Sequence, residues 1–318
     1  MKRVLVTGSA GFLGSNLSES LLRSGCEVIG FDNFYTGSRE NTSRLEELYP
    51  KFRFFEGDVL DLPDHFGELT HIYNLACPAS PPKYQKDPIY TLKISVLGVM
   101  NLAEMAESKG AKLLHTSTSE VYGDPKEHPQ REAYWGHVNP IGIRSCYDEG
   151  KRCAETYLMD MHRMTKNPIK IVRIFNTYGP YMAADDGRVV SNFIIQALKG
   201  EDITIYGKGE QTRSFCYVDD LVRGMISFMD LESPEVGPIN LGNPIEFTVM
   251  ELAEKVLSKI DSKSKLRFEP LPSDDPIKRK PDIQLAKSTL GWEPKIFLDE
   301  GLDLTINYFK QKLMRESK

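Results

Sequence analysis

The chain has 318 residues, about twice the usual length of a single domain, so it has room for one large domain or two joined ones. Hydrophobic residues make up 40% of it and charged residues 27%, a balance that supports a sizeable core and excludes disorder as its main character. Its net charge of −5 argues against nucleic-acid polymers and anionic membranes as partners. The five cysteines are scattered and form no C-x-x-C pair, so neither a disulfide framework nor a zinc site is expected.

The N-terminal sequence carries no targeting signal that we recognise. Met1-Lys2-Arg3 leads directly into an apolar strand rather than into the hydrophobic region of a signal peptide. We find no run of about 18 apolar residues of the kind that spans a membrane. A cytoplasmic protein without a membrane partner is therefore expected.

Short apolar strands alternate with helices through the first half of the chain. Strands are predicted at 4–6, 27–31, 52–55, 71–75, 112–116 and 169–175. Helices are predicted after Gly11, at 88–109 and at 147–165, where apolar residues recur at helical spacing. This alternation predicts an α/β fold, in which a mostly parallel sheet is covered by helices on both faces.

The pattern changes after about residue 180, where Pro and Gly become frequent and the strands shorten. Helices are predicted at 190–199, 218–230, 247–259 and 299–314, with short strands at 203–206 and 238–241. We interpret residues 1–180 as one domain and residues 181–318 as a smaller C-terminal α/β lobe that interleaves with the end of the sheet. The two tryptophans, Trp135 and Trp292, are expected to be packing anchors.

A glycine-rich segment follows the first strand and opens the first helix. Glycines at Gly8, Gly11 and Gly14 allow the backbone to turn tightly and to approach a pyrophosphate at the helix N-terminus, where Phe12 and Leu13 lie. The spacing G-x-x-G-x-x-G is one residue longer than the common dinucleotide fingerprint, and by itself it is also compatible with a tight turn that binds no ligand. Together with the alternating elements it predicts a doubly wound sheet of the Rossmann type, with the first domain binding a dinucleotide.

The end of the second predicted strand favours NAD over NADP. Asp32 stands there and is followed by Asn33. A carboxylate at this position accepts hydrogen bonds from a ribose diol and repels a 2′-phosphate, and no arginine stands next to it. Asp58 and Val59, after the third strand, are predicted adenine contacts, with a loop cap as the alternative for Asp58.

Tyr147 and Lys151 are spaced i and i+4 on a predicted helix, which places both side chains on one face. A tyrosine with its ordinary pKa of about 10 is a poor base at neutral pH, and a neighbouring ammonium group lowers that pKa. The pair follows a strand that ends in Thr116-Ser117-Thr118-Ser119-Glu120, downstream of the dinucleotide loop. This order makes chance a poor explanation and predicts a catalytic tyrosine–lysine pair.

The glycine loop, Asp32, the Thr116–Glu120 strand end and the tyrosine–lysine pair together resemble the extended short-chain dehydrogenases/reductases that modify nucleotide sugars. The resemblance covers nearly the whole chain and includes Asn176–Pro180, Arg188–Phe193, Gln211–Arg213 and Tyr217–Asp220. Within that family the chain resembles the UDP-glucuronate decarboxylases, or UDP-xylose synthases, at Pro78–Tyr84, Tyr134–Pro140, Asp274–Pro276 and Lys278–Asp282. Golgi members of this group carry an N-terminal membrane anchor, so a chain without one is expected to be a soluble form.

The resemblance implies an enzyme that uses NAD, and no metal, to convert a UDP-sugar, UDP-glucuronate, to UDP-xylose and CO2. C4 of the sugar is oxidised while Tyr147 accepts the hydroxyl proton, the resulting β-keto acid loses CO2, and C4 is then reduced again. Two alternatives remain: a UDP-hexuronate 4-epimerase, and a non-catalytic NAD-sensing protein on the same fold. Intact Tyr147 and Lys151 argue against the second alternative.

The resemblance also implies catalytic roles at the end of the fifth strand. Thr118 is expected to hydrogen-bond the C4 oxygen beside Tyr147, and Glu120 to order water or assist proton transfer at C5. The family's 4,6-dehydratases resemble this chain but have Asp at the position of Ser119, and that acid can expel a hydroxyl group. Serine is no such acid, so water elimination is disfavoured; whether Ser119 packs or acts directly stays open.

Arg279 is expected at the substrate, where a guanidinium contacts a carboxylate or diphosphate through two parallel hydrogen bonds. The alternative is that Lys278–Lys280 is a solvated charge run. The predicted substrate-binding residues are Tyr84, Lys93, Asn176, Asn192, Tyr206, Arg213 and Arg279. Further residues assigned to the cofactor are Leu75, Ala76, Thr177 and Arg188. The helices at 88–109 and 147–165 are expected to pair across a homodimer as a four-helix bundle.

Overall fold

The computed structural model describes residues 1–271 and 278–316, so the predicted motif Asp274–Pro276 lies outside the described residues. The strands of the main sheet are β1 (Arg3–Thr7), β2 (Glu27–Asp32), β3 (Phe52–Glu56), β4 (His71–Asn74), β5 (Lys112–Thr118), β6 (Ile169–Ile174) and β11 (Ile239–Leu241). Within the described ranges these seven strands lie in the order β11-β6-β5-β4-β1-β2-β3, and all are parallel. The predicted Rossmann-type sheet is confirmed.

The strand order reverses beside β1, which pairs with β2 on one side and with β4 on the other. In such a sheet the carboxyl ends of the two strands that flank the reversal frame a crevice. The Gly8 amide donates to the Phe31 carbonyl at 2.9 Å, and the Leu75 amide donates to the Thr7 carbonyl at 3.1 Å. The loops that leave β1, β2 and β4 therefore begin side by side at the same edge of the sheet.

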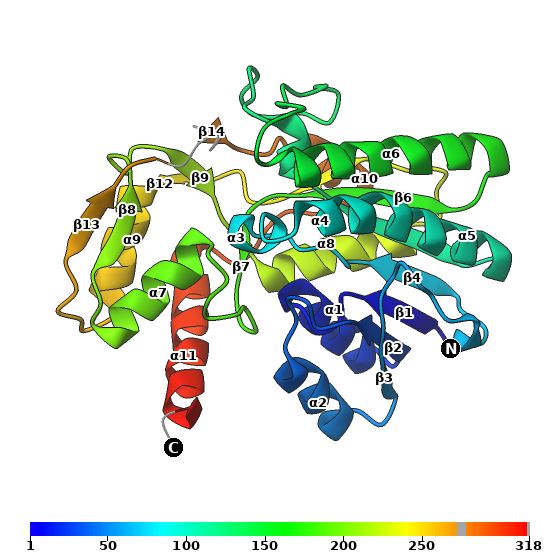
Figure 1. Cartoon of the computed structure of the whole chain (residues 1–318), viewed down its shortest axis with the longest axis horizontal. Helices are drawn as coiled ribbons and strands as arrows, with labels where there is room; N and C mark the ends of the chain where they lie inside the picture. Colours follow the sequence, from blue (N-terminus) through cyan, green and yellow to red (C-terminus); the bar gives the residue numbers. More distant parts are fainter. Residues whose placement is uncertain (272–277, 317–318) are drawn as a thin grey trace.

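Helices cover both faces of this sheet (Figure 1). One face carries α1 (Phe12–Arg23) and α8 (Val218–Asp230), and the other carries α5 (Val99–Lys109) and α6 (Ser145–Thr165). Residues of β1 alternate between the two layers: Val4 and Val6 pack with α1 and α8, whereas Leu5 packs with α5 and α6. This alternation explains why an unbroken apolar run, rather than a polar–apolar one, forms the central strand.

The predicted helix at 88–109 is present as three consecutive pieces: α4 (Pro88–Lys93), a π-helical segment η2 (Ile94–Gly98) and α5. The same segment corrects the expectation that no part of the chain is long and apolar enough to span a membrane. Among the described helices, Pro88–Lys109 is long and apolar enough to cross a membrane by length and composition, with a mean hydropathy of 1.2 over its best window. Half of that window is buried within the protein, and the core helix of a folded domain meets the same criterion.

The C-terminal half contributes a second group of elements, which lies to the left of the main sheet in Figure 1. Its helices are α7 (Val189–Lys199), α9 (Val249–Lys259) and α11 (Leu298–Glu316), whereas α10 (Gln284–Leu290) lies beside the main sheet, against β11 and α8. Its strands are β7 (Thr177–Tyr178), β8 (Ile203–Tyr206), β9 (Thr212–Ser214), β10 (Cys216–Tyr217), β12 (Glu246–Thr248), β13 (Leu266–Glu269) and β14 (Lys278–Arg279). The predicted helices at 190–199, 247–259 and 299–314 are confirmed to within two residues at each end.

Several short elements escaped the sequence analysis. α2 (Arg39–Leu48) is a polar helix without a clear apolar stripe, and it begins after Ser38, whose side chain accepts from the Glu40 amide. The shortest helical turns are η1 (Asp64–Phe66), α3 (Pro81–Tyr84) and η3 (Ser119–Tyr122). β9 lies between β12 and β14, and each of the three strands has only two or three residues. Such strands exist through pairing with distant segments, a signal that local periodicity does not contain.

The two halves of the chain share the main sheet and one apolar core. β11 forms an edge of the sheet and α8 covers one of its faces, although both come from residues beyond 180. The core that contains Leu17 of α1 continues to Phe309 of α11. The division into domains at residue 180 stays a prediction, because β11 and α8 belong to the second part of the chain but lie in or on the main sheet.

The two tryptophans have opposite environments, and the expectation that both are packing anchors is wrong for Trp135. Trp292 is 1% exposed and donates from its indole nitrogen to the Asp220 carbonyl at 2.9 Å, whereas Trp135 is 88% exposed. We expect Trp292→Ala to lower the free energy of unfolding by about 3–5 kcal/mol, since it leaves a cavity in the shared core. Trp135→Ala is the matched control and should change stability by less than about 0.5 kcal/mol in denaturant unfolding. Equal effects of the two substitutions would contradict this assignment.

Candidate active site

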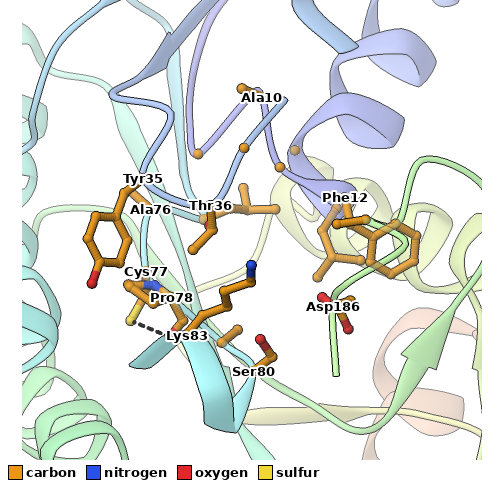
Figure 2. Close-up of a pocket in the computed structure, with 18 of the residues that line it drawn as sticks. Ala10, Phe12, Tyr35, Thr36, Ala76, Cys77, Pro78, Ser80, Lys83 and Asp186 are labelled. Carbon is orange, nitrogen blue, oxygen red and sulfur yellow. Dashed lines mark hydrogen bonds between the residues drawn. The ribbon is translucent and has the colours of Figure 1, made fainter. Parts of the chain in front are cut away.

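A cavity of about 660 Å³ opens at the carboxyl ends of β1, β2, β4 and β5. All of the predicted cofactor residues line it: Gly8, Gly11, Phe12, Leu13, Gly14, Asp32, Asn33, Asp58, Val59, Leu75, Ala76, Tyr147, Lys151, Thr177 and Arg188. Figure 2 shows Lys83 of α3 extending into the space beneath the loop that carries Ala10, with Phe12 and Asp186 on the far side. The topology has therefore gathered residues from the whole first half of the chain around one crevice.

The glycine loop fits a dinucleotide pyrophosphate. Gly8 has a positive φ of 72°, and a Cβ atom on it would lie 2.6 Å from the Leu75 carbonyl oxygen. A Cβ on Gly14 would lie 2.0 Å from the Gly8 carbonyl oxygen, so only glycine allows the loop to fold back onto α1. Among the described residues, no side chain caps the first turn of α1, which follows Gly11. Gly11 and the first residues of α1 line the cavity, so an anion in it can lie at a helix N-terminus.

Asp32 and Asn33 shape the next part of the cavity. The Asp32 carboxylate accepts from the Ala10 amide at 3.0 Å and from the Phe34 amide at 2.8 Å. Burial raises the pKa of Asp32, and these two hydrogen bonds oppose the rise. Asn33 and the Tyr90 hydroxyl both donate to Oδ2 of Asp58, at 2.9 and 2.6 Å. The carboxylate chosen for the ribose is therefore held rigidly by the glycine loop, in a form suited to accept hydrogen bonds from a diol.

Arg39 does not serve a 2′-phosphate in this structure. Its guanidinium donates to both carboxylate oxygens of Glu56, at 3.0 and 2.8 Å, and lies 4.1 Å from the centroid of the Phe34 ring. This geometry agrees with the choice of NAD over NADP that Asp32 indicated.

The tyrosine–lysine pair lies at the inner end of the cavity, on the first two turns of α6. Lys151 Nζ donates to the Thr116 carbonyl at 2.7 Å and lies 5.9 Å from the centroid of the Tyr147 ring. Thr118 lines the cavity with Tyr147, and its hydroxyl oxygen accepts from the Glu120 amide at 3.2 Å. The expected lowering of the tyrosine pKa is wrong for this state, because burial raises the pKa of Tyr147 well above its ordinary value.

Tyr84 lies behind the catalytic tyrosine. The two rings stack with centroids 5.0 Å apart and an interplanar angle of 2°, and Tyr84 is buried. Its hydroxyl has no hydrogen-bond partner in the described part of the chain, and the residue does not line the cavity. The prediction that Tyr84 contacts the sugar stays a prediction, and in this structure the ring of Tyr84 supports that of Tyr147 by stacking.

Glu120 is surrounded by arginines at the meeting point of the two lobes. Arg279 of β14 donates to both of its carboxylate oxygens, and Arg144, the residue before α6, donates to Oε2 at 2.8 Å. Burial acts to raise the pKa of Glu120, but the charges of Arg279 and Arg144 outweigh it and hold the pKa below the usual value. Arg279 is buried, so the alternative of a solvated charge run is wrong for this residue.

Asp148 brings a second carboxyl group to this cluster. It is buried, and its Oδ1 has no hydrogen-bond partner among the described residues. Burial, with the charge of Glu120 as a second cause, raises the pKa of Asp148 to about 7. Two carboxyl groups with pKa values displaced in opposite directions therefore lie beside Tyr147, an arrangement typical of catalytic sites.

Comparison with known proteins places this geometry in a family. Residues 4–242 match the model of the NAD dependent epimerase/dehydratase family. The chain belongs to this family. UDP-glucuronic acid decarboxylase 1 of Arabidopsis thaliana is 53% identical over 316 residues, which cover 99% of this chain and 72% of that protein. UDP-glucuronic acid decarboxylase 1 of Danio rerio is 49% identical over 316 residues, which cover 99% of this chain and 74% of that protein.

Solved structures of the family have the same fold. UDP-glucuronic acid 4-epimerase from Bacillus cereus, in complex with UDP-glucuronic acid and NAD, has a TM-score of 0.88 and 29% identity, covering 98% of this chain and 99% of its own. UDP-glucose 4-epimerase from Thermotoga maritima, with UDP-glucose, has a TM-score of 0.88 and 31% identity, covering 98% and 99%. Epimerases and decarboxylases thus share the scaffold, and the site residues must distinguish them.

The predicted catalytic and substrate residues have several different placements in this family fold. Thr118, Ser119, Glu120 and Asn176 line the cavity, whereas Arg279 contacts it through Glu120. Arg213 pairs in register with Arg279 on adjacent strands, and both are buried. The cavity lining also lacks Lys93, Asn192 and Tyr206, and the side chains of Lys93 and Tyr206 are exposed. Their roles stay predictions.

Several charged residues of the site escaped the sequence analysis, Asp148 among them. Lys83 lines the cavity and pairs with Asp185 at 2.5 Å, and it lies in the Pro78–Tyr84 segment, which could have indicated it. Asp186 receives both hydrogen bonds of the Arg188 guanidinium. Arg144 had no local signal, because its position in an irregular loop does not reveal that it reaches Glu120. Within the described ranges, no group of three metal-ligating side chains is found.

The Gly14 position provides a direct test of the cofactor loop. Gly14→Ala should lower NAD retention at least about ten-fold, because its Cβ would collide with the Gly8 carbonyl oxygen. Cofactor content of the purified protein, measured by absorbance after denaturation, reports the effect. Gly291→Ala is the matched control: it introduces a side chain at a positive φ of 59° with open space around it, so it should cost stability but not NAD. Full NAD content in the Gly14 variant would refute the assignment.

The raised pKa of Asp148 predicts a pH-dependent stability difference. Its folded-state pKa of about 7 exceeds the ordinary 3.8, so ionising Asp148 costs stability as pH rises between these values. Asp148→Asn should therefore gain stability over the wild type progressively from about pH 4 to about pH 7 and level off above that, in urea unfolding at several pH values. A flat difference for Asp148→Asn would contradict the assigned pKa.

Proposed function

We propose that the protein converts UDP-glucuronate to UDP-xylose and CO2 with NAD as its cofactor. The observation that carries this conclusion is 53% identity across 99% of the chain with a UDP-glucuronic acid decarboxylase, against 29% with a UDP-glucuronic acid 4-epimerase. The site is consistent with it, because buried arginines suited to a carboxylate stand next to the tyrosine–lysine pair.

The residues around the cavity fit NAD. Gly8 and Gly14 would admit the pyrophosphate, Asp32 would accept the ribose hydroxyls, and Lys151 would hold the second ribose beside Tyr147. When bound, NAD supplies the acceptor of the hydride from C4 of the sugar and the donor that returns it, so the overall reaction is redox-neutral.

The chain's own residues manage the proton at the C4 oxygen. Tyr147 Oη takes the C4 hydroxyl proton as C4 becomes a ketone, and gives it back when C4 is reduced. Thr118, which lines the cavity with Tyr147, orients the C4 oxygen. Lys151 is buried beneath the phenol and, with its proton on, provides the positive charge that favours the phenolate form. Tyr84 fixes the plane of the phenol by stacking against it.

The C4 ketone itself drives the loss of the carboxylate carbon, C6, as CO2. A ketone at C4 is β to the C5 carboxylate, so loss of CO2 leaves an enolate that is protonated at C5. Arg279 offers a bidentate site for the carboxylate, and Glu120 orders water or assists proton transfer at C5. Ser119 lines the cavity and carries no acid group, which disfavours elimination of water.

The decisive experiment is incubation of the purified protein with UDP-glucuronate and no added cofactor. We expect mass spectrometry to detect UDP-xylose and CO2. The NAD that copurifies with the protein is regenerated in each turnover, so no cofactor has to be added. The Bacillus cereus structure favours a second candidate, because that 4-epimerase binds the same sugar nucleotide on the same fold. UDP-galacturonate with its carboxylate retained would establish the epimerase instead, and no product would favour an NAD sensor.

The catalytic tyrosine can be tested against its stacked neighbour. Tyr147→Phe removes the group that takes the C4 proton, so kcat should fall by about 10²–10⁴-fold. Tyr84→Phe removes a hydroxyl without a partner in the described residues and keeps the stacking ring, so its kcat should stay within a few-fold of the wild type. Unchanged kcat in Tyr147→Phe would remove this residue from the mechanism.

We also propose that the protein is a homodimer in which α4–α5 and α6 of one protomer pack against the same helices of its partner. Ile89, Leu92 and Leu97 are exposed on this segment, which supports burial against another copy. Leu97→Glu should convert the dimer to a monomer in light scattering, whereas Leu304→Glu on α11, also exposed, should not. A wild-type monomer would overturn this proposal. A cytoplasmic location remains a prediction.

A further inference from the structure

The geometry around Glu120 assigns a function to Arg144 that neither the sequence nor the known reaction indicates. Glu120 lies in η3, at the carboxyl end of β5, and its carboxylate is held from two sides. Arg279 arrives from β14 in the second lobe and uses two nitrogens, and Arg144 arrives from the loop before α6 and uses one. All three side chains are largely shielded from solvent.

On the proposed function, Arg279 changes partner when the substrate carboxylate takes the edge that now holds Glu120. That edge is made of the two terminal nitrogens of the guanidinium, and both of them donate to Glu120 in this structure. If the sugar carboxylate occupies Arg279, Glu120 loses both of those hydrogen bonds. A buried carboxylate without a partner takes up a proton or moves, and either change would end its role at C5.

Arg144 is placed to prevent this. Its side chain reaches Glu120 Oε2 at 2.8 Å, while its carbonyl oxygen accepts from the amides of Tyr147 and Asp148 at 3.0 and 3.1 Å. One residue therefore ties the carboxylate to the first turn of α6, which carries the catalytic phenol. The link does not involve the second lobe and so survives any change at Arg279.

The charges around Glu120 support this reading. Among the described residues, the groups that act on it include three arginines, of which Arg213 is the third. The acidic or phenolic groups that it acts on in return are Asp148, Tyr147 and Tyr84. Among the described residues, more than one arginine thus acts on the Glu120 carboxylate, so Glu120 keeps a cationic neighbour when Arg279 turns to the substrate.

We propose that Arg144 is the positioning residue that keeps Glu120 ionised and directed at C5 while Arg279 exchanges Glu120 for the carboxylate of the substrate. This inference rests on the proposed function. It concerns the same reaction but names the residue that makes the exchange of partners feasible.

The test compares Arg144→Met and Arg144→Lys with Arg152→Met. Removing the charge next to Glu120 raises the pKa of that carboxyl, so the acid limb of the kcat–pH profile of Arg144→Met should move up by at least about 0.5 pH units, with kcat reduced at least about ten-fold and KM nearly unchanged. Arg144→Lys keeps the charge and should restore the position of the acid limb and part of kcat. Arg152 lies on α6, which Arg144 precedes, and it donates to the carbonyls of Val121 and Trp135, so its loss should leave the limb in place.

Each result decides the matter. An unmoved acid limb in Arg144→Met, or losses of equal size with unmoved limbs in the Met and Lys variants, would overturn the inference and mark a merely structural residue. If Arg144→Met fails to fold, Arg144→Gln takes its place with the same expected shift. CO2 release by the wild type must be seen first: its absence defeats the proposed function, whereas CO2 release with an unmoved limb defeats this inference alone.

Discussion

The buried ion cluster at Glu120 is the interaction on which the active site depends. It joins the end of β5 in the main sheet, the start of α6 and the short strand β14, three segments that are far apart in the chain. Charges removed from water are stable only when they are paired and hydrogen-bonded, so the cluster forces its three side chains into one geometry. On the proposed function, the Arg279–Glu120 ion pair of this cluster breaks when Arg279 binds the carboxylate of the substrate.

The reversal of strand order beside β1 supplies the other half of the site. Because the chain leaves β1 towards one edge and β4 towards the other, the loops after both strands open onto the same crevice. Gly8 and Gly14 let the first loop fold back on itself, and Asp32 is fixed to that loop through the Ala10 amide. Cofactor binding is thus a property of the sheet, whereas substrate recognition depends on how the second lobe meets it.

Local signals were sufficient wherever one segment acts alone. The helical spacing of Tyr147 and Lys151, the glycine loop and the carboxylate at the end of β2 each depend on a few neighbouring residues, and the structure places all of them in the cavity lining. Prediction failed where a residue acts through a distant partner. Neither the irregular loop around Arg144 nor the two-residue strand β14 shows locally that it meets Glu120. The raised pKa of Tyr147 follows from burial, which no spacing rule measures.

The sequence by itself determined the fold class, the choice of NAD and the tyrosine–lysine pair, because these depend on periodicity, on glycines and on side chains a few residues apart. Only the tertiary structure decided which charges meet. It stacked Tyr84 on Tyr147, buried Arg279 against Glu120, and brought Arg144 to the same carboxylate. The physical reason is that electrostatic energy depends on distance and burial across the fold, and neither is encoded in the order of neighbouring residues.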